Sequence, residues 1–130
     1  MPRFRLLLPL VLGSLAAPAL ADPAVGLWRT EPDRKNLTSL IRIDTCGAAL
    51  CGTVLKAFDP QGREVQTANV GKRLFWDLKP AGSGNYGGGT VRVPLLNVQA
   101  KAKAELSGDK LHVTGCKGLV CDGQTWVRAN

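Results

Sequence analysis

The sequence is poor in the side chains that catalysis uses. It holds one histidine, His112, which stands between two apolar residues on what should be the outer face of a strand. No serine or cysteine nucleophile is joined to His112 by a recognisable motif, and the carboxylates fall on polar strand faces or in turns. We therefore predict that the protein is not an enzyme, and we predict no catalytic residue and no cofactor.

A run of like charge is also missing. The chain has 17 Lys and Arg against 10 Asp and Glu, but the basic residues stand singly or in pairs, such as Arg34 with Lys35 and Lys72 with Arg73. No series of aromatic residues accompanies them, so a nucleic-acid partner is not predicted. A basic surface still attracts anionic partners in a salt-dependent way, which leaves an envelope protein, an anionic lipid or a glycan open as a partner.

No apolar run reaches the length of about 20 residues that a membrane-spanning helix needs. Residues 1–21, MPRFRLLLPLVLGSLAAPALA, have a basic start, a short apolar stretch and an Ala-Leu-Ala end, which together predict a secretory signal peptide. The first cysteine, Cys46, is too far from this cleavage site to carry a lipid. We expect no membrane anchor after cleavage, and one domain at 22–130 with a net charge of +5, since two of the 17 basic residues are removed.

The sequence has no odd number of cysteines and no Cys-x-x-Cys motif. Cys46 and Cys51 are separated by four residues, as are Cys116 and Cys121, which is wider than redox motifs and at the edge of zinc-site spacing, so no metal is predicted. In an exported chain four cysteines predict disulfides, for which three pairings exist. Glycine within each short loop and β-rich flanks favour the local pairs Cys46–Cys51 and Cys116–Cys121, each across a hairpin.

Alternation of apolar and polar residues recurs through the chain and predicts strands instead of helices. Even the segment from Val98 to Leu106, which is rich in helix-forming residues, alternates in this way. Eight strands are predicted, at residues 25–31, 38–46, 50–58, 73–78, 85–93, 96–106, 110–116 and 121–129. Turn residues separate most of them, so we predict an all-β, single, antiparallel, eight-stranded up-and-down barrel, with a β-sandwich as the alternative.

Small residues on the predicted inner face leave room for a ligand. Ala100, Ala102 and Ala104, together with a run of three glycines at 87–89, would free volume inside a barrel. The predicted lining of an apolar pocket with one polar group is Leu74, Trp76, Tyr86, Val98, Ala100, Ala102 and Ala104. The same small residues are also typical of tightly coiled strands, so an interior filled by side chains remains the alternative to a pocket.

Phe75 points away from Leu74 and Trp76 if its strand alternates regularly. It would then be exposed beside Lys72 and Arg73, forming a basic edge with an aromatic tip. Such an edge favours a second hypothesis, in which the barrel has a solid core and binds an envelope protein, a lipid or a glycan through its outer surface.

Two tryptophans occupy places that resemble the structural signature of lipocalin-like barrels. Gly26 and Trp28 form a Gly-x-Trp near the predicted mature N-terminus, and Arg128 follows two residues after Trp126. The resemblance implies that Arg128 lies across the indole of Trp28 and closes one end of the barrel, which allows a cation–π contact. Trp28, Trp126 and Arg128 are therefore assigned structural roles.

The stretches GLWRT, IRIDTCGAALCGTV, GGGTV and LHVTGCKGLVCDGQTWVR occur in an order that resembles a family of small exported proteins of Gram-negative bacteria, domain of unknown function 2147. The resemblance implies a lipocalin-like barrel in the periplasm and no established activity. Val93-Pro94 and Asn85-Tyr86 depart from the family pattern. The resulting hypothesis is a non-enzymatic binder of a small apolar or amphipathic ligand inside the barrel, and the alternative is the surface interaction module.

Overall fold

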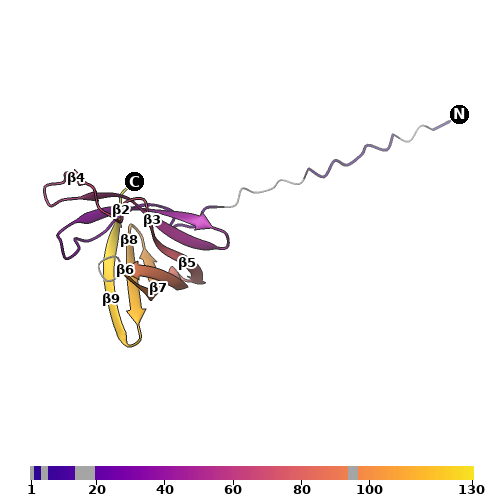
Figure 1. The fold of residues 1–130 in the computed structure, drawn as a ribbon. Helices are drawn as coiled ribbons and strands as arrows, with labels where there is room; N and C mark the ends of the chain where they lie inside the picture. The colour runs from indigo at the N-terminus through magenta and orange to yellow at the C-terminus, as the bar shows by residue number, and fades with distance from the viewer. Residues whose placement is uncertain (1, 4–5, 14–19, 94–96) are drawn as a thin grey trace.

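Strands account for most of the chain in a computed structural model that describes residues 2–3, 6–13, 20–93 and 97–130 (Figure 1). Nine strands are formed among these residues: β1 (Gly26–Arg29), β2 (Thr38–Cys46), β3 (Ala49–Phe58), β4 (Glu64–Val65), β5 (Arg73–Gly82), β6 (Asn85–Val93), β7 (Val98–Ser107), β8 (Lys110–Lys117) and β9 (Val120–Arg128). The strand predicted at 96–106 begins at a residue outside the described part of the chain. Among the described residues, no helix is long and apolar enough to span a membrane.

The strands close into one antiparallel barrel. Their order is β2-β1-β9-β8-β7-β6-β5-β3-β4, and an additional pairing between β2 and β3 joins the two sides of the sheet. Closure leaves β4 as a short addition to β3 outside the ring of eight strands. The predicted eight-stranded up-and-down barrel is confirmed, and the β-sandwich alternative is wrong.

The interior follows from alternation along the strands. On β7, Ala100, Ala102 and Ala104 are buried while Lys101 and Lys103 between them are exposed, so the pattern overrides the helix propensity of these residues. One cluster of buried side chains fills the barrel: Ala24, Trp28, Ile41, Ile43, Leu50, Val54, Phe75, Leu78, Tyr86, Ala102, Ala104, Leu111, Val113 and Trp126. The described strands and this cluster all lie at Ala24 or later, within the predicted mature chain.

Two facing β-bulges change the side on which residues of β5 and β6 point. Leu50 and Gly52 of β3 lie opposite Leu78 and Phe75 of β5, so two steps on one strand match three on the other. The same mismatch occurs between β6 and β7 over residues 86–89. Asp77 and Gly88 have φ values of 57° and 68° at these places, in the left-handed region that bulges commonly use. Residues three apart can therefore both face the interior.

Phe75 is the residue whose predicted position is wrong. It was expected on the surface, but its side chain is 1% exposed and belongs to the core. The prediction assumed a period of two through Asp77, whereas the bulge there puts Phe75 and Leu78 on the same side. Gly52 provides the necessary space, because a Cβ at this position would overlap the Phe75 ring.

The four cysteines form the two local disulfides that the spacing favours. Cys46 is bonded to Cys51 across the β2–β3 hairpin, with 5.8 Å between their Cα atoms. Cys116 is bonded to Cys121 across the β8–β9 hairpin, where the two residues are direct partners with Cα atoms 4.1 Å apart. Loops this short stabilise the fold by only about 2 kcal/mol each in the chain-entropy model, so their main effect is to fix hairpin register.

Replacing Gly52 by alanine should destabilise the barrel by about 1 to 3 kcal/mol, the usual cost of overpacking a core. Urea unfolding of the chain from Asp22 measures this change. Gly87→Ala is the matched control, because a Cβ at Gly87 meets no atom within 4 Å. A wild-type unfolding midpoint for Gly52→Ala would contradict the packing of Phe75 on Gly52, and adding Phe75→Leu should recover part of the lost stability.

Candidate functional site

The segment before β1, residues 22–25, is held by side chains of β1 and β9. The Arg128 guanidinium carbon lies 4.3 Å from the centroid of the Trp28 ring. Its Nη2 donates a hydrogen bond of 2.6 Å to the carbonyl of Pro23, and Trp28 Nε1 donates one of 2.8 Å to the carbonyl of Ala24. These contacts tie residues 22–25 to β1 and β9 and place a cation on the face of the Trp28 ring.

Tyr86 of β6 also contacts the segment before β1. Its side chain is 5% exposed, and its hydroxyl donates a 2.6 Å hydrogen bond to Asp22 Oδ1. The backbone N–H of Ala24 donates to the same carboxylate oxygen at 2.8 Å. Burial raises the pKa of Tyr86 well above its usual value, and the hydrogen bond and negative charge of Asp22 raise it further. The polar group predicted to serve a ligand is thus bonded to the chain's own N-terminal segment.

The structure brings together only part of the predicted pocket lining. Tyr86, Ala102 and Ala104 belong to the core cluster, and Leu74 packs against it while partly exposed. Ala100 is buried and Val98 is half-buried at the start of β7. Trp76 is next to the inward-facing Phe75 and remains half-buried outside the core cluster. The alanines therefore pack in an interior that also holds the rings of Phe75 and Trp126, whose centroids are 6.2 Å apart.

A groove of about 370 Å³, open to solvent, lies on the outside of β6, β7 and β8. Thr90, Lys101 and Cys116 follow one another across these three strands in register, and all three line the groove together with Gln99, Ala100, Lys117 and Gly118. Lys101 is exposed between two buried alanines, so this row faces outward. We call this feature the outer groove.

A second hollow of about 340 Å³ is lined in part by Leu20 and Ala21. Both residues belong to the predicted signal peptide, so this hollow would lose part of its wall when the peptide is removed. The outer groove contains no residue from that segment and is the better candidate site.

The residues that line the outer groove come mainly from the basic part of the sequence. Segment 72–117 holds eight Lys and Arg and three Asp and Glu, which gives +5, whereas segment 22–71 holds six of each and is neutral. The entire net charge of the predicted mature chain therefore comes from the strands β5 to β8. Lys101 and Lys117 contribute two of these charges to the groove itself.

The chain's one histidine lies outside the outer groove. His112 is exposed on β8, and its Nδ1 lies 3.1 Å from Thr125 Oγ1. Within the described part of the chain, no group of three or more His, Cys, Asp and Glu side chains is placed to hold a metal ion.

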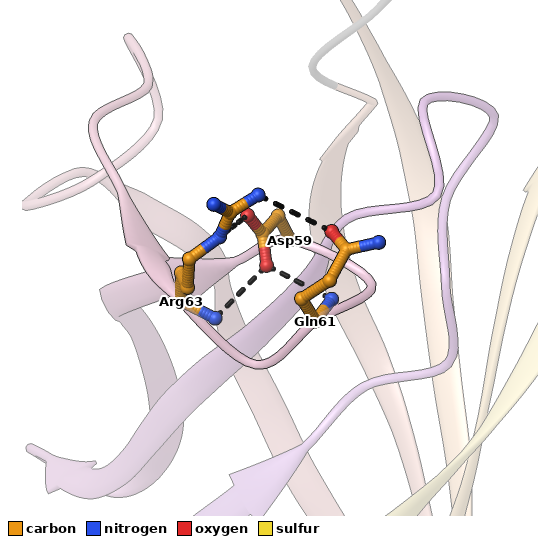
Figure 2. A network of polar contacts seen from close by, with 3 residues as sticks. All are labelled: Asp59, Gln61 and Arg63. Carbon is orange, nitrogen blue, oxygen red and sulfur yellow. Dashed lines mark hydrogen bonds and ion pairs between the residues drawn. The ribbon is translucent and has the colours of Figure 1, made fainter.

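Figure 2 shows a network of polar contacts in the turn between β3 and β4. Asp59 Oδ1 accepts hydrogen bonds of 2.9 Å from the backbone N–H groups of Gln61 and Arg63, and Arg63 Nε donates to Asp59 Oδ2 at 2.8 Å. The backbone hydrogen bond from Arg63 is the main cause that lowers the pKa of Asp59. The network stabilises a tight turn within residues 59–63.

Comparison with known proteins agrees with this fold. A model of the family described as "Uncharacterized protein conserved in bacteria (DUF2147)" matches residues 26–128. The chain belongs to this family. The resemblance seen in the sequence is therefore confirmed, and the family's description assigns no activity.

Among solved structures, the chain is similar to protein HP1028 from Helicobacter pylori, which is described as belonging to the lipocalin family. The TM-score is 0.66 at 14% sequence identity, with 82% of each chain covered. At this identity the likeness shows the fold alone. No curated protein matches the chain.

Stability should fall at alkaline pH because of Tyr86. Its pKa is raised on folding, so its contribution is complete below the unfolded-state pKa of about 10 and is lost as the pH rises above that value. We expect Tyr86→Phe to be less stable than wild type near neutral pH and to lose less stability between about pH 8 and pH 11. Urea unfolding at both pH values measures this, and an equal loss in both proteins would contradict the role of Tyr86.

Proposed function

We propose that this family member is a non-enzymatic binding protein, exported to the periplasm, that holds a small anionic, amphipathic molecule in the outer groove. The observation that carries the proposal is the position of the outer groove, which opens to solvent on the outer surface beside two lysines. Its volume of about 370 Å³ falls within the range of small-molecule sites, about 300 to 1,000 Å³.

A site inside the barrel receives less support. An eight-stranded barrel is just wide enough either to be filled by side chains or to hold one small ligand. Here Trp28 and Phe75 are at most 1% exposed, and Trp126 is 3% exposed in the same cluster. The interior then serves as a rigid scaffold, and binding is assigned to its outer surface.

The groove's chemistry favours an anion with an apolar part. Lys101 and Lys117 supply positive charge, and Thr90 supplies a hydroxyl that can donate a hydrogen bond. The Cys116 disulfide adds apolar surface beside them. Because the surrounding segment 72–117 carries the whole net charge, association with an anion should weaken as salt concentration rises.

Native mass spectrometry tests the proposal on protein purified from the periplasm of a bacterium that expresses the full chain. We expect an adduct in the native spectrum that is lost on denaturation and is an anion when identified. Lys101→Glu should lose it, with at least about a tenfold weaker affinity for the identified molecule. Lys56→Glu, an exposed lysine of β3 outside the basic segment, is the matched control and should retain the adduct.

Two results would overturn the assignment. Protein without any adduct, before and after incubation with periplasmic extract, would remove the small-molecule function. An adduct that Lys101→Glu retains as fully as wild type would place the molecule elsewhere on the barrel.

A further inference from the structure

The hairpin between β8 and β9 ends in two apolar side chains that nothing covers. Leu119 is fully exposed and Val120 is 75% exposed. With Lys117 and Gly118 they form the hairpin tip, defined here as residues 117–120. The other short hairpin turns have small or polar residues at this place, namely Gly47-Ala48, Ser83-Gly84 and Gly108-Asp109.

A comparison of the two disulfide hairpins shows that this exposure is not a property of the motif. In CGAALC, which spans Cys46 to Cys51, the leucine is Leu50, which is 3% exposed and lies opposite Leu78 of β5. In CKGLVC, which spans Cys116 to Cys121, the leucine is Leu119 and points into solvent. The same covalent frame therefore returns its apolar residues to the core in one case and presents them outward in the other.

The projection of the hairpin follows from strand pairing. Within the described residues, β9 pairs with β1 only through Arg128 and Val127. The part of β9 from Val120 to Gln124 pairs with β8 on one side and has no such partner strand on the other. Figure 1 shows the β8–β9 hairpin extending past its neighbouring strands.

The tip is held rigidly although it projects. Cys116 and Cys121 are direct cross-strand partners immediately beneath it, and Gly118 has a φ of 62°, which suits a tight hairpin turn. A fixed pair of aliphatic side chains loses little conformational freedom on contact with an apolar phase, which favours association.

Basic residues surround the base of the tip. Lys117 is the first residue of the hairpin tip. Lys101 is the cross-strand partner of Cys116, and Lys103 follows Lys101 on the same outer face of β7. Asp122 is the one acidic residue next to the stapled loop, and its carboxylate accepts a hydrogen bond from the N–H of Gly123. An aliphatic tip above a basic belt matches an interface with anionic phosphates outside and acyl chains beneath.

We propose that the hairpin tip docks the protein on an anionic phospholipid surface. Leu119 and Val120 enter the boundary between headgroups and acyl chains, while Lys101, Lys103 and Lys117 contact headgroup phosphates. Each lysine near such a surface contributes about fivefold to the binding constant, and the two small aliphatic side chains add a reversible anchor. The proposal stands without the groove ligand, because Leu119 and Val120 do not line the outer groove.

Vesicle co-sedimentation tests the docking with the chain from Asp22, which contains every described strand and core residue. The vesicles are pure phosphatidylcholine, or phosphatidylcholine with roughly a third phosphatidylglycerol as the anionic lipid. We expect binding to the anionic vesicles only, weakened by salt, and at least about fivefold weaker binding for Leu119→Ser with Val120→Ser. Val127→Ser is the matched control, since Val127 is 46% exposed on the same strand but far from the tip.

Depth of insertion separates docking from electrostatic adsorption. A Leu119→Trp variant should be quenched by brominated lipid in anionic vesicles, well beyond the quenching of the wild-type tryptophans. Equal binding by the serine variant and wild type, or no additional quenching of Leu119→Trp, would overturn the proposal in favour of adsorption through lysines alone. Binding to neither vesicle would also overturn it and would leave a protein partner as the occupant of the tip. Unchanged urea midpoints verify that the variants are folded.

Discussion

Closure of the barrel depends on the short contact between its first and last strands. β1 and β9 share only two residue pairs, Trp28 with Arg128 and Arg29 with Val127, so pairing alone gives this junction few hydrogen bonds. The contact is reinforced from above by the Arg128 guanidinium on the Trp28 ring and from the N-terminal side by the carbonyls of Pro23 and Ala24. Trp28 pairs with β9 and is also fully buried in the core cluster. Ring closure and core packing therefore both depend on Trp28.

The interior is shaped by a second constraint, the paired bulges at Asp77 and Gly88. Without them, β5 would send Leu74 and Trp76 inward and leave Phe75 outside. With them, Phe75 enters the core over Gly52, and Leu78 follows on the same side. The Phe75 ring therefore occupies the interior, where a regular strand would have placed Trp76, and Trp76 remains half-buried. Because Phe75 fills this space, Ala102 belongs to a packed cluster instead of lining an open pocket.

Local patterns were sufficient to predict eight of the nine strands and to favour the local pairing of the four cysteines, since alternation and hairpin spacing depend on residues near in sequence. Alternation alone left a β-sandwich open, and the two-residue β4 was not predicted. The positive φ of Asp77 leaves no mark in that alternation, so the position of Phe75 was predicted wrongly. Gly52 within a β-rich stretch was the available signal, because an isolated glycine often marks a bulge or a close approach. The bond between Tyr86 and Asp22 joins residues 64 apart in the sequence, and only the folded chain brings them together.

The separation of charge between the two halves of the chain gives this scaffold a direction. Residues 22–71 are neutral overall and include the β1 to β4 strands, whereas residues 72–117 carry +5 and form β5 to β8. A basic surface that served only solubility would gain nothing from a bulky aliphatic pair at its edge, because exposed Leu and Val oppose solubility. Leu119 and Val120 lie beside Lys117, at the end of the basic segment, and a disulfide holds them in place. The two features together at one stapled tip match a partner that offers negative charge and an apolar layer together, which is the chemistry of an anionic bilayer surface.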